Sequence, residues 1–180
     1  MKYVNRLLQE TEYLQMIKEL EQKEKERIFC GHGLSHALDV ARIGWILALE
    51  RGREGTKESG EAFKEKIYLT ALLHDLGRLQ EMKHGIPHHR AGAALAGELL
   101  EQIQYPRKER NDILEAVSGH RGEQQVIPAS DSECRIEQKS NIDFINLIKE
   151  ADNRSRNCFC CSVQEGCNWS EERRNQGIFW

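Results

Sequence analysis

The feature that most constrains the fold of this chain is a set of apolar stripes at helical spacing that each end on a histidine or an aspartate. One stripe steps from Ile67 to Ala71 and then by three residues to His74, which Asp75 follows directly. Four other stripes end in the same way, on His36, His88, His120 and Asp152. Because residues three and four apart share a helix face, these side chains should point inward where the apolar faces end.

The same spacing predicts helices along the chain and no sheet. We expect one or two amphipathic helices over residues 3–27, ending in a solvated charge run at 21–27. Main helices are expected over about 36–50, 62–77, 88–104, 107–119 and 142–156. Ser35 and Asn141 should cap two of them, and Gly77 suits a left-handed cap. The predicted fold class is therefore all-α, a helical bundle.

A chain of 180 residues suits a single domain with a sizeable core. We expect an N-terminal helical segment (1–27) packed on the bundle, a main domain (28–157) and a Cys-rich C-terminal tail (158–180). The polar stretch 121–140 should be a long loop, and such loops are usually functional or mobile. Between Gly77 and the helix at 88 we expect only a short connection through Gly85 and Pro87.

Composition excludes several classes of protein. The chain is 39% hydrophobic and 31% charged, with a net charge of −3. We therefore expect no direct nucleic-acid binding, because no strong positive field draws the chain to phosphates. An apolar run near the length of a membrane span is absent, and the first residues are charged rather than signal-like. These observations predict a cytoplasmic protein and leave its oligomeric state open.

The ionisable ends of the apolar stripes point to bound cations. Burying one such group without a partner is costly, although a single buried histidine is more often satisfied by a hydrogen bond in the core. Six such positions on five helices are most simply explained by convergence on metal ions. Imidazole and carboxylate without thiolate suit transition metals. We favour divalent ions of iron or manganese, with zinc, nickel, cobalt and magnesium as alternatives.

Several short segments carry a resemblance to a known family. Residues 36–41 resemble its first-helix histidine motif, and residues 73–78 resemble its His-Asp signature. Residues 88–93 are similar to a His-x-x-x-Gly-Ala segment, and residues 151–152 resemble a closing Ala-Asp. Over residues 28–156 the chain thus resembles the HD-domain superfamily of metal-dependent phosphohydrolases.

The resemblance implies roles for these residues. Mononuclear members use the equivalents of His36, His74, Asp75 and Asp152. The additional His88 and His120 resemble ligands of a second metal, with Asp75 as the bridging carboxylate, so the resemblance predicts a binuclear site. His88 is preferred to its neighbour His89 because it fits both the apolar stripe and the spacing to Gly92. His32 is expected at the entrance or behind the ligands.

The predicted activity is hydrolysis by metal-activated water of a phosphate ester, phosphodiester or pyrophosphate bond in a small, nucleotide-type substrate. The expected catalytic residues are His74, Asp75 and Arg78, because the Arg78 guanidinium can bind phosphate oxygens bidentately. The alternatives are a regulatory module that keeps the metal cage without turnover, and a redox- or iron-sensing protein.

The tail carries a second motif. Cys158, Cys161 and Cys167 form a Cys-x-x-Cys pair plus a third thiol, a pattern that is compatible with a separate zinc or iron–sulfur site but does not favour one. The fourth ligand would be Cys160, Cys30 or Cys134. The alternative is a set of reduced thiols that pack as small hydrophobes. Trp169, Phe179 and Trp180 suggest that the tail docks onto the body.

Overall fold

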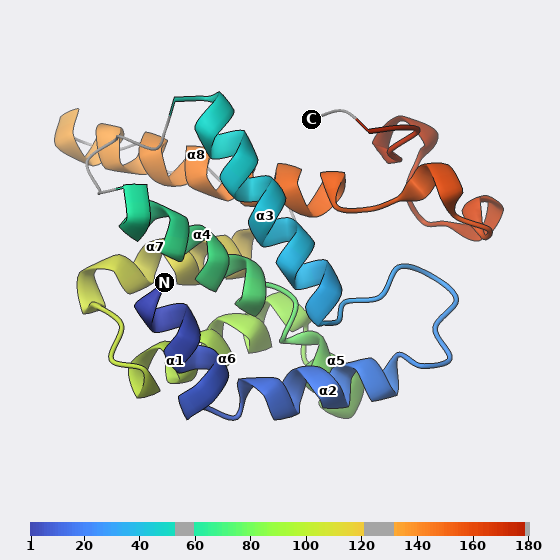
Figure 1. The fold of residues 1–180 in the computed structure, drawn as a ribbon, viewed down its shortest axis with the longest axis horizontal. Helices are drawn as coiled ribbons and strands as arrows, with labels where there is room; N and C mark the ends of the chain where they lie inside the picture. Colours follow the sequence, from blue (N-terminus) through green and yellow to red (C-terminus); the bar gives the residue numbers. More distant parts are fainter. Residues whose placement is uncertain (53–59, 121–131, 179–180) are drawn as a thin grey trace.

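The computed structural model describes residues 1–52, 60–120 and 132–178, with side chains described for all of these except 132–141. The described residues form helices and no strand, which confirms the all-α prediction. The α-helices are α1 (Lys2–Glu10), α2 (Tyr13–Lys23), α3 (Leu34–Glu50), α4 (Gly60–Leu73), α5 (Arg78–His84), α6 (His88–Gln102), α7 (Arg107–Gly119) and α8 (Ser132–Arg154) (Figure 1). Short 3-10 helices follow in the C-terminal segment: η1 (Cys158–Cys160), η2 (Gln164–Gly166) and η3 (Glu171–Arg173).

The central element is α4, whose second half, from Ile67 to Leu73, is apolar on nearly all sides and is therefore suited to full burial. Its Leu72 and Leu73 belong to one core cluster with residues of α1, α2, α6 and α7. Its Ile67 and Ala71 belong to a second cluster with residues of α3 and α8. Because the His-Asp motif comes directly after α4, the chain delivers it between these two cores.

The first two helices pack into the bundle core. Glu65 of α4 accepts hydrogen bonds from the backbone N–H groups of Tyr3 (2.6 Å) and Val4 (3.1 Å), which satisfies the first turn of α1. The Tyr13 hydroxyl of α2 donates to the Leu72 carbonyl at 3.0 Å. The domain boundaries drawn above, at 27/28 and 157/158, stay predictions.

Two of the predicted helix caps are wrong. Helix α3 begins at Leu34, one residue before the predicted cap Ser35, and its first N–H donates to Glu21 Oε1 at 2.9 Å. Asn141 lies inside α8, which begins at Ser132. The sequence over 132–140 contains neither glycine nor proline and is rich in good helix formers, so the helix extends into the stretch expected to be loop. Residues 121–131 of that expected loop lie outside the described residues.

Gly77 does not adopt the predicted left-handed cap. Its φ is −61° and it leads directly into α5, a helix where only a connection was expected. A Cβ at Gly77 would lie 2.0 Å from the His88 carbonyl oxygen and 2.4 Å from the Gly92 nitrogen, so glycine is required here by close approach to α6. The left-handed cap lies eight residues later, at Gly85 with φ 70°, where α5 ends.

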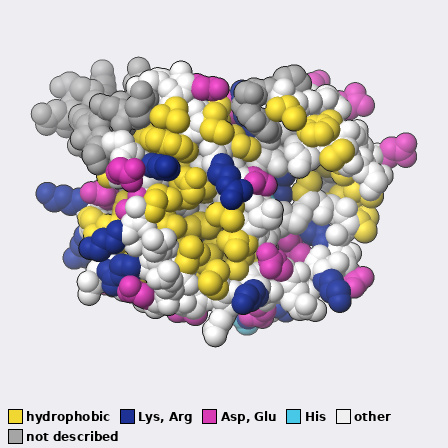
Figure 2. All heavy atoms as spheres, in the orientation of Figure 1, with side chains coloured by type: hydrophobic (Ala, Val, Ile, Leu, Met, Phe, Trp, Pro, Cys, Tyr) yellow, Lys and Arg dark blue, Asp and Glu magenta, His cyan; other side chains and the backbone are white. Residues whose placement is uncertain are grey.

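The surface fits the weak net charge of the sequence. Figure 2 shows basic and acidic side chains interspersed on the face seen in Figure 1, with apolar side chains between them. In the parts of the chain that the structure describes, no helix combines the length and apolar character needed to cross a membrane.

Candidate metal centre

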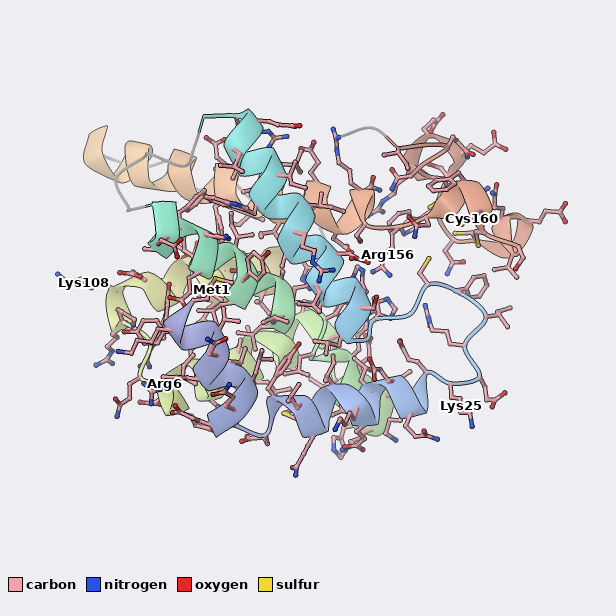
Figure 3. The ribbon with its side chains drawn as sticks, in the orientation of Figure 1. Met1, Arg6, Lys25, Lys108, Arg156 and Cys160 are labelled. Atoms are coloured by element: carbon pink, nitrogen blue, oxygen red, sulfur yellow. The ribbon has the colours of Figure 1, made fainter. Side chains whose placement is uncertain are left out.

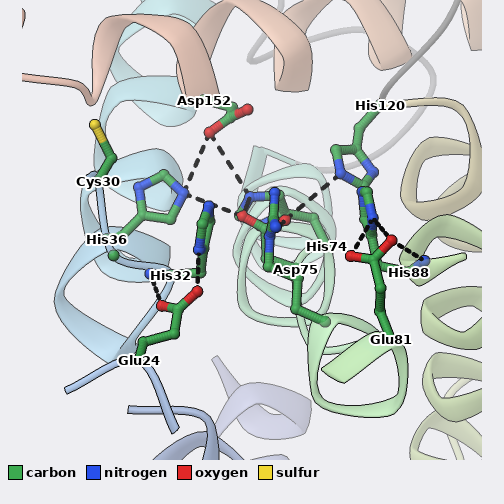
Figure 4. Close-up of polar contacts among 12 residues, drawn as sticks. Glu24, Cys30, His32, His36, His74, Asp75, Glu81, His88, His120 and Asp152 are labelled. Carbon is green, nitrogen blue, oxygen red and sulfur yellow. Dashed lines mark hydrogen bonds and ion pairs between the residues drawn. The ribbon is translucent and has the colours of Figure 1, made fainter. Parts of the chain in front are cut away.

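The structure brings all six predicted ligand residues together from five helices. His36 lies in the first turn of α3, His88 begins α6, and His120 caps the C-terminus of α7. His74 and Asp75 follow α4, and Asp152 lies in the last turn of α8. Figure 4 shows these side chains pointing toward one another.

The six residues form two overlapping groups whose potential ligand atoms all lie within 4.8 Å of one another. The first group consists of His36, His74, Asp75 and Asp152, and the second of Asp75, His88 and His120. Asp75 belongs to both groups. Its Oδ2 lies 3.0 Å from His74 Nε2 and 3.5 Å from His36 Nε2, and its Oδ1 lies 3.7 Å from His120 Nε2. The carboxylate thus presents one oxygen to each group.

Each histidine of the two groups is held through its Nδ1. In His74 and His120 this nitrogen lies 2.7 Å from the carbonyl oxygen three residues earlier, Ala71 and Val117 respectively. His36 Nδ1 lies 3.1 Å from Ser155 Oγ. His88 Nδ1 lies 3.0 Å from Glu81 Oε2. An oxygen partner at Nδ1 directs Nε2 toward the centre, which is how proteins orient metal-binding histidines.

Strong electrostatic coupling marks the centre. Burial alone would raise the pKa of Asp75, but the charge on His74 and the neighbouring imidazoles of His120 and His36 hold that pKa well below its usual range. The imidazoles of His36 and His74, with the Arg156 guanidinium, likewise outweigh burial and hold the pKa of Asp152 well below its usual range. Burial opposes a proton on His74, yet the two carboxylates raise the pKa of that imidazole to about 10. The centre therefore favours positive charge among its carboxylates.

Three buried atoms of the centre test whether it fits a metal. Within the described parts of the chain, no hydrogen-bond partner reaches His74 Nε2, His120 Nε2 or Asp75 Oδ2. A buried polar atom left unsatisfied costs about 1–3 kcal/mol. A cation at each group would satisfy these atoms at once, and imidazole with carboxylate suits a divalent transition metal. The residues present therefore fit the metal that the sequence predicts.

Two arginines add charge to the centre, and one of them was missed from the sequence. Arg156 donates from Nη2 to His36 Nε2 (2.8 Å) and to Asp152 Oδ1 (3.0 Å). The predicted phosphate contact Arg78 donates from Nε to Asp75 Oδ1 at 2.9 Å. Arg156 lies one helical turn beyond Asp152, and that spacing of four was a signal that could have identified it.

The sequence also failed to indicate two glutamates that support histidines. Glu81, which holds His88, lies on α5, and no helix was expected there. Glu24 was assigned to a solvated charge run, but it is buried and accepts from the His32 backbone N–H (2.8 Å) and pairs with His32 Nδ1 (2.6 Å). His32 is buried behind His36, at 6.1 Å between ring centroids. Burial lowers the pKa of His32 to about 4.

The choice between the adjacent histidines of α6 agrees with the geometry. His88 is buried and belongs to the second group. His89 is half-buried and belongs to neither group, with its ring centroid 5.8 Å from that of His88. Periodicity alone separated these two residues.

A groove leads to the centre from the side of the C-terminal segment. Its volume is about 500 Å³, and His36, Ser155 and Arg156 line its inner part. Cys30 and Cys161 line it farther out, where the loop before α3 faces the tail. The groove is large enough for a small phosphorylated molecule, since ligand pockets begin at about 300 Å³.

Comparison with known proteins agrees with this geometry. A family model described as HD domain matches residues 33–157. A curated relative named only as an uncharacterized protein, from Clostridium beijerinckii, is 34% identical over 176 residues, which cover 98% of each chain. No solved structure gives a significant match.

Proposed function

The chain belongs to the HD domain family, whose members are metal-dependent hydrolases, and from this premise we propose that it is a binuclear phosphohydrolase. The substrate class is a small phosphate ester, phosphodiester or pyrophosphate, of which nucleotides are the leading candidates. The observation that carries the proposal is the single carboxylate of Asp75 shared between two ligand groups.

The ligand assignment follows from the two groups. His36, His74, Asp75 and Asp152 would hold the first ion. The second would lie between Asp75 and two further histidines, His88 and His120. Because Nδ1 of each histidine already faces an oxygen, Nε2 would be the ligand atom. Two bound ions would supply an activated water and neutralise charge on the phosphoryl oxygens.

The protein's own groups prepare the site for a phosphate. Arg156 lines the groove, so its guanidinium is placed to receive phosphate oxygens as they approach His36. Arg78 uses Nε to hold Asp75, which leaves its Nη nitrogens for the phosphate role expected from the sequence. Five of the six ligand residues are buried and His36 is partly buried, which limits water and strengthens each charge interaction.

Metal analysis combined with hydrolysis assays tests the proposal. In protein purified without chelator, the His/Asp centre should contain two equivalents of a divalent transition metal, counted apart from any ion that the cysteine thiols hold. It should then hydrolyse members of a panel that includes p-nitrophenyl phosphate, bis(p-nitrophenyl) phosphate and nucleotides. His88→Ala should reduce the metal content from two equivalents to one, whereas His89→Ala, the adjacent histidine of the same helix, should retain two.

The outcomes separate the alternatives. One equivalent in the wild type, unchanged by His88→Ala, would leave a mononuclear centre. Two equivalents with no turnover of any substrate, in any tested metal, would instead support a regulatory module that keeps the cage.

A further inference from the structure

The C-terminal segment, residues 157–178, has almost no hydrophobic core of its own. Of its side chains, only those of Cys158 and Asn175 are buried, while Phe159 is 42% exposed and Ile178 is 66% exposed. A segment of this size that buries so little apolar surface ordinarily needs a disulfide or a metal to hold its shape. The described cysteines are all free thiols.

Two similar turns of this segment each end in a cysteine. In the first, Cys161 follows η1 and its backbone N–H donates to the Cys158 carbonyl at 3.1 Å. In the second, Cys167 follows η2 and its N–H donates to the Gln164 carbonyl at 3.1 Å. The Gln164 side chain also donates to the Cys158 carbonyl at 2.7 Å, which ties the two turns together. Both Cys161 and Cys167 have the same extended backbone after their turn.

A fourth thiol comes from the loop before α3. Cys30 and Cys161 line the same groove, and Phe29 lies against the second turn, where a Cβ at Gly166 would be 3.8 Å from its ring. Figure 3 shows several sulfur atoms gathered beneath the C-terminal segment near Cys160, and Figure 4 shows the Cys30 sulfur pointing away from the histidines. The fold therefore brings together thiols that are more than 120 residues apart in sequence.

The loop that carries Cys30 is fixed by hydrogen bonds. Arg27 Nε donates to the Cys30 carbonyl at 2.9 Å, and Arg156 Nη1 donates to the neighbouring Gly31 carbonyl at 2.9 Å. Glu24 holds the next residue, His32, through two contacts. A ligand on a fixed backbone loses less entropy when it binds an ion.

Backbone N–H groups are directed at two of the sulfur atoms. The Trp169 backbone N–H donates to Cys167 Sγ at 3.5 Å. Burial raises the pKa of the Cys158 thiol, and so do the neighbouring thiols of Cys30, Cys167 and Cys161, while a hydrogen bond from the Asn175 backbone lowers it. Backbone N–H groups directed at sulfur are the usual outer support of thiolate metal sites.

We propose that Cys30, Cys158, Cys161 and Cys167 bind a second type of metal, a structural zinc-class ion in tetrahedral thiolate coordination, which joins the C-terminal segment to the loop before α3. Four thiolates with no open position define a closed, structural site. Each thiol loses its proton to solvent as it coordinates the ion. Among the described residues, groups of three or more potential ligand atoms that all lie within 4.8 Å of one another occur only in the His/Asp centre, so the four thiols must close on the ion as it binds.

The first test uses the intact wild-type protein and cobalt as a probe. Protein refolded or grown with Co²⁺ should show a thiolate-to-cobalt charge-transfer band and intense visible bands of tetrahedral cobalt. Zinc added in stoichiometric amount should bleach them. A wild-type spectrum without thiolate bands overturns the proposal, whatever the variants do. Iron with acid-labile sulfide in the purified protein would also overturn it, because the thiols would then hold a cluster.

The second test assigns the ligands one by one. Serine substitution of any of the four thiols should remove the charge-transfer band or shift it and lower the zinc content by one equivalent. Cys160→Ser is the matched control, since the Cys160 thiol already donates to the Asn157 carbonyl at 3.3 Å and should leave the spectrum unchanged. If Cys30→Ser also leaves it unchanged, the four-ligand site is wrong.

The thiolate site can be tested independently of the His/Asp centre. His120→Ala should lower the metal content of that centre and keep the thiolate band, whereas Cys158→Ser should do the reverse. Failure of either proposal therefore does not count against the other.

Discussion

The His/Asp centre and the C-terminal thiols are two sets of metal-type ligands that the same chain positions in different ways. Each ligand of the centre begins or ends a helix whose apolar face is buried, and α4 delivers His74 and Asp75 between two cores. The thiols lie on short turns that are held mainly by hydrogen bonds. Packing therefore fixes the centre without an ion, whereas the thiol cluster would depend on its ion for rigidity.

Replacement of the shared carboxylate should have the largest effect. Asp75→Asn removes the charge that both ligand groups use, so metal-dependent hydrolysis should fall on the order of a thousand-fold, or about 4 kcal/mol of transition-state stabilisation. Steady-state assays with the best substrate of the panel measure this loss. Glu98→Gln, an exposed carboxylate of α6, is the control and should behave as wild type. Comparable activity in Asp75→Asn would remove the shared ligand from the mechanism.

Gly77→Ala, which adds a methyl group at the contact with α6, should lower the free energy of unfolding by about 3 kcal/mol, the upper end of the usual cost of overpacking. The added Cβ would meet the His88 carbonyl and the Gly92 nitrogen, which are backbone atoms and move only with the helix. Urea unfolding measures the change. Gly97→Ala is a matched control, because its Cβ would meet only Leu114 at 3.9 Å. That control should be stabilised by about 0.5–1 kcal/mol through helix propensity, and equal stability of both variants would show that the contact is not tight.

His32 and His74 should respond to pH in opposite directions in the metal-free protein. Burial lowers the pKa of His32 to about 4, so the folded state binds its proton less readily than the unfolded state does. Its contribution to stability is therefore complete above pH 6.5 and is lost as the pH falls from 6.5 toward 4, by about 3 kcal/mol in total. The pKa of His74 is raised to about 10, so its contribution is complete below pH 6.5 and is lost as the pH rises toward 10.

The loss of stability between pH 6.5 and 4 can be tested with the variant His32→Gln. The free energy of unfolding is measured by urea denaturation in the presence of chelator across this pH range. The variant should lose the decline between pH 6.5 and 4 that is due to His32, while the decline between pH 6.5 and 10 should remain. If the variant loses as much stability between pH 6.5 and 4 as the wild type does, the pKa of His32 is not lowered in the folded protein.

Loosening the C-terminal segment should have the smallest effect on global stability. Asn175 Nδ2 donates to the carbonyl oxygens of Asn153 (2.6 Å) and Arg156 (2.9 Å). Asn175→Ala should change the free energy of unfolding by no more than about 1 kcal/mol. It should nevertheless speed hydrogen exchange in peptides of residues 157–178 and leave α4 unaffected. The exposed Asn168→Ala is the control, and faster exchange throughout the bundle would contradict the separation of the two regions.

The sequence predicted the ligands of the centre because they continue apolar stripes. Helical periodicity alone indicated which face His74, His120 and Asp152 occupy, and the preference for His88 over its neighbour rested on the same argument. The all-α class followed from the same pattern. The sequence carries no such signal for residues whose role depends on contact between two separate helices or loops.

Three residues illustrate that limit. Glu81 and Glu24 are charged residues on polar stretches, and each becomes functional only when the fold places it against a histidine. Gly77 was assigned a role in helix termination because glycine commonly has that role. Its actual constraint, contact with the α6 backbone, comes from an element that lies eleven residues or more away in sequence.

The way in which the histidines are held has a consequence for how the centre can evolve. His74 and His120 are anchored by carbonyl groups of their own chain, three residues earlier, and no substitution at those positions removes a carbonyl. His36 and His88 are anchored by the side chains of Ser155 and Glu81, which single mutations can replace. The orientation of His74 and His120 is thus insensitive to substitutions at neighbouring positions. The orientation of His36 and His88, by contrast, can be changed by a single substitution of the side chain that holds each one. We expect divergence among related proteins to be concentrated at the two side-chain anchors.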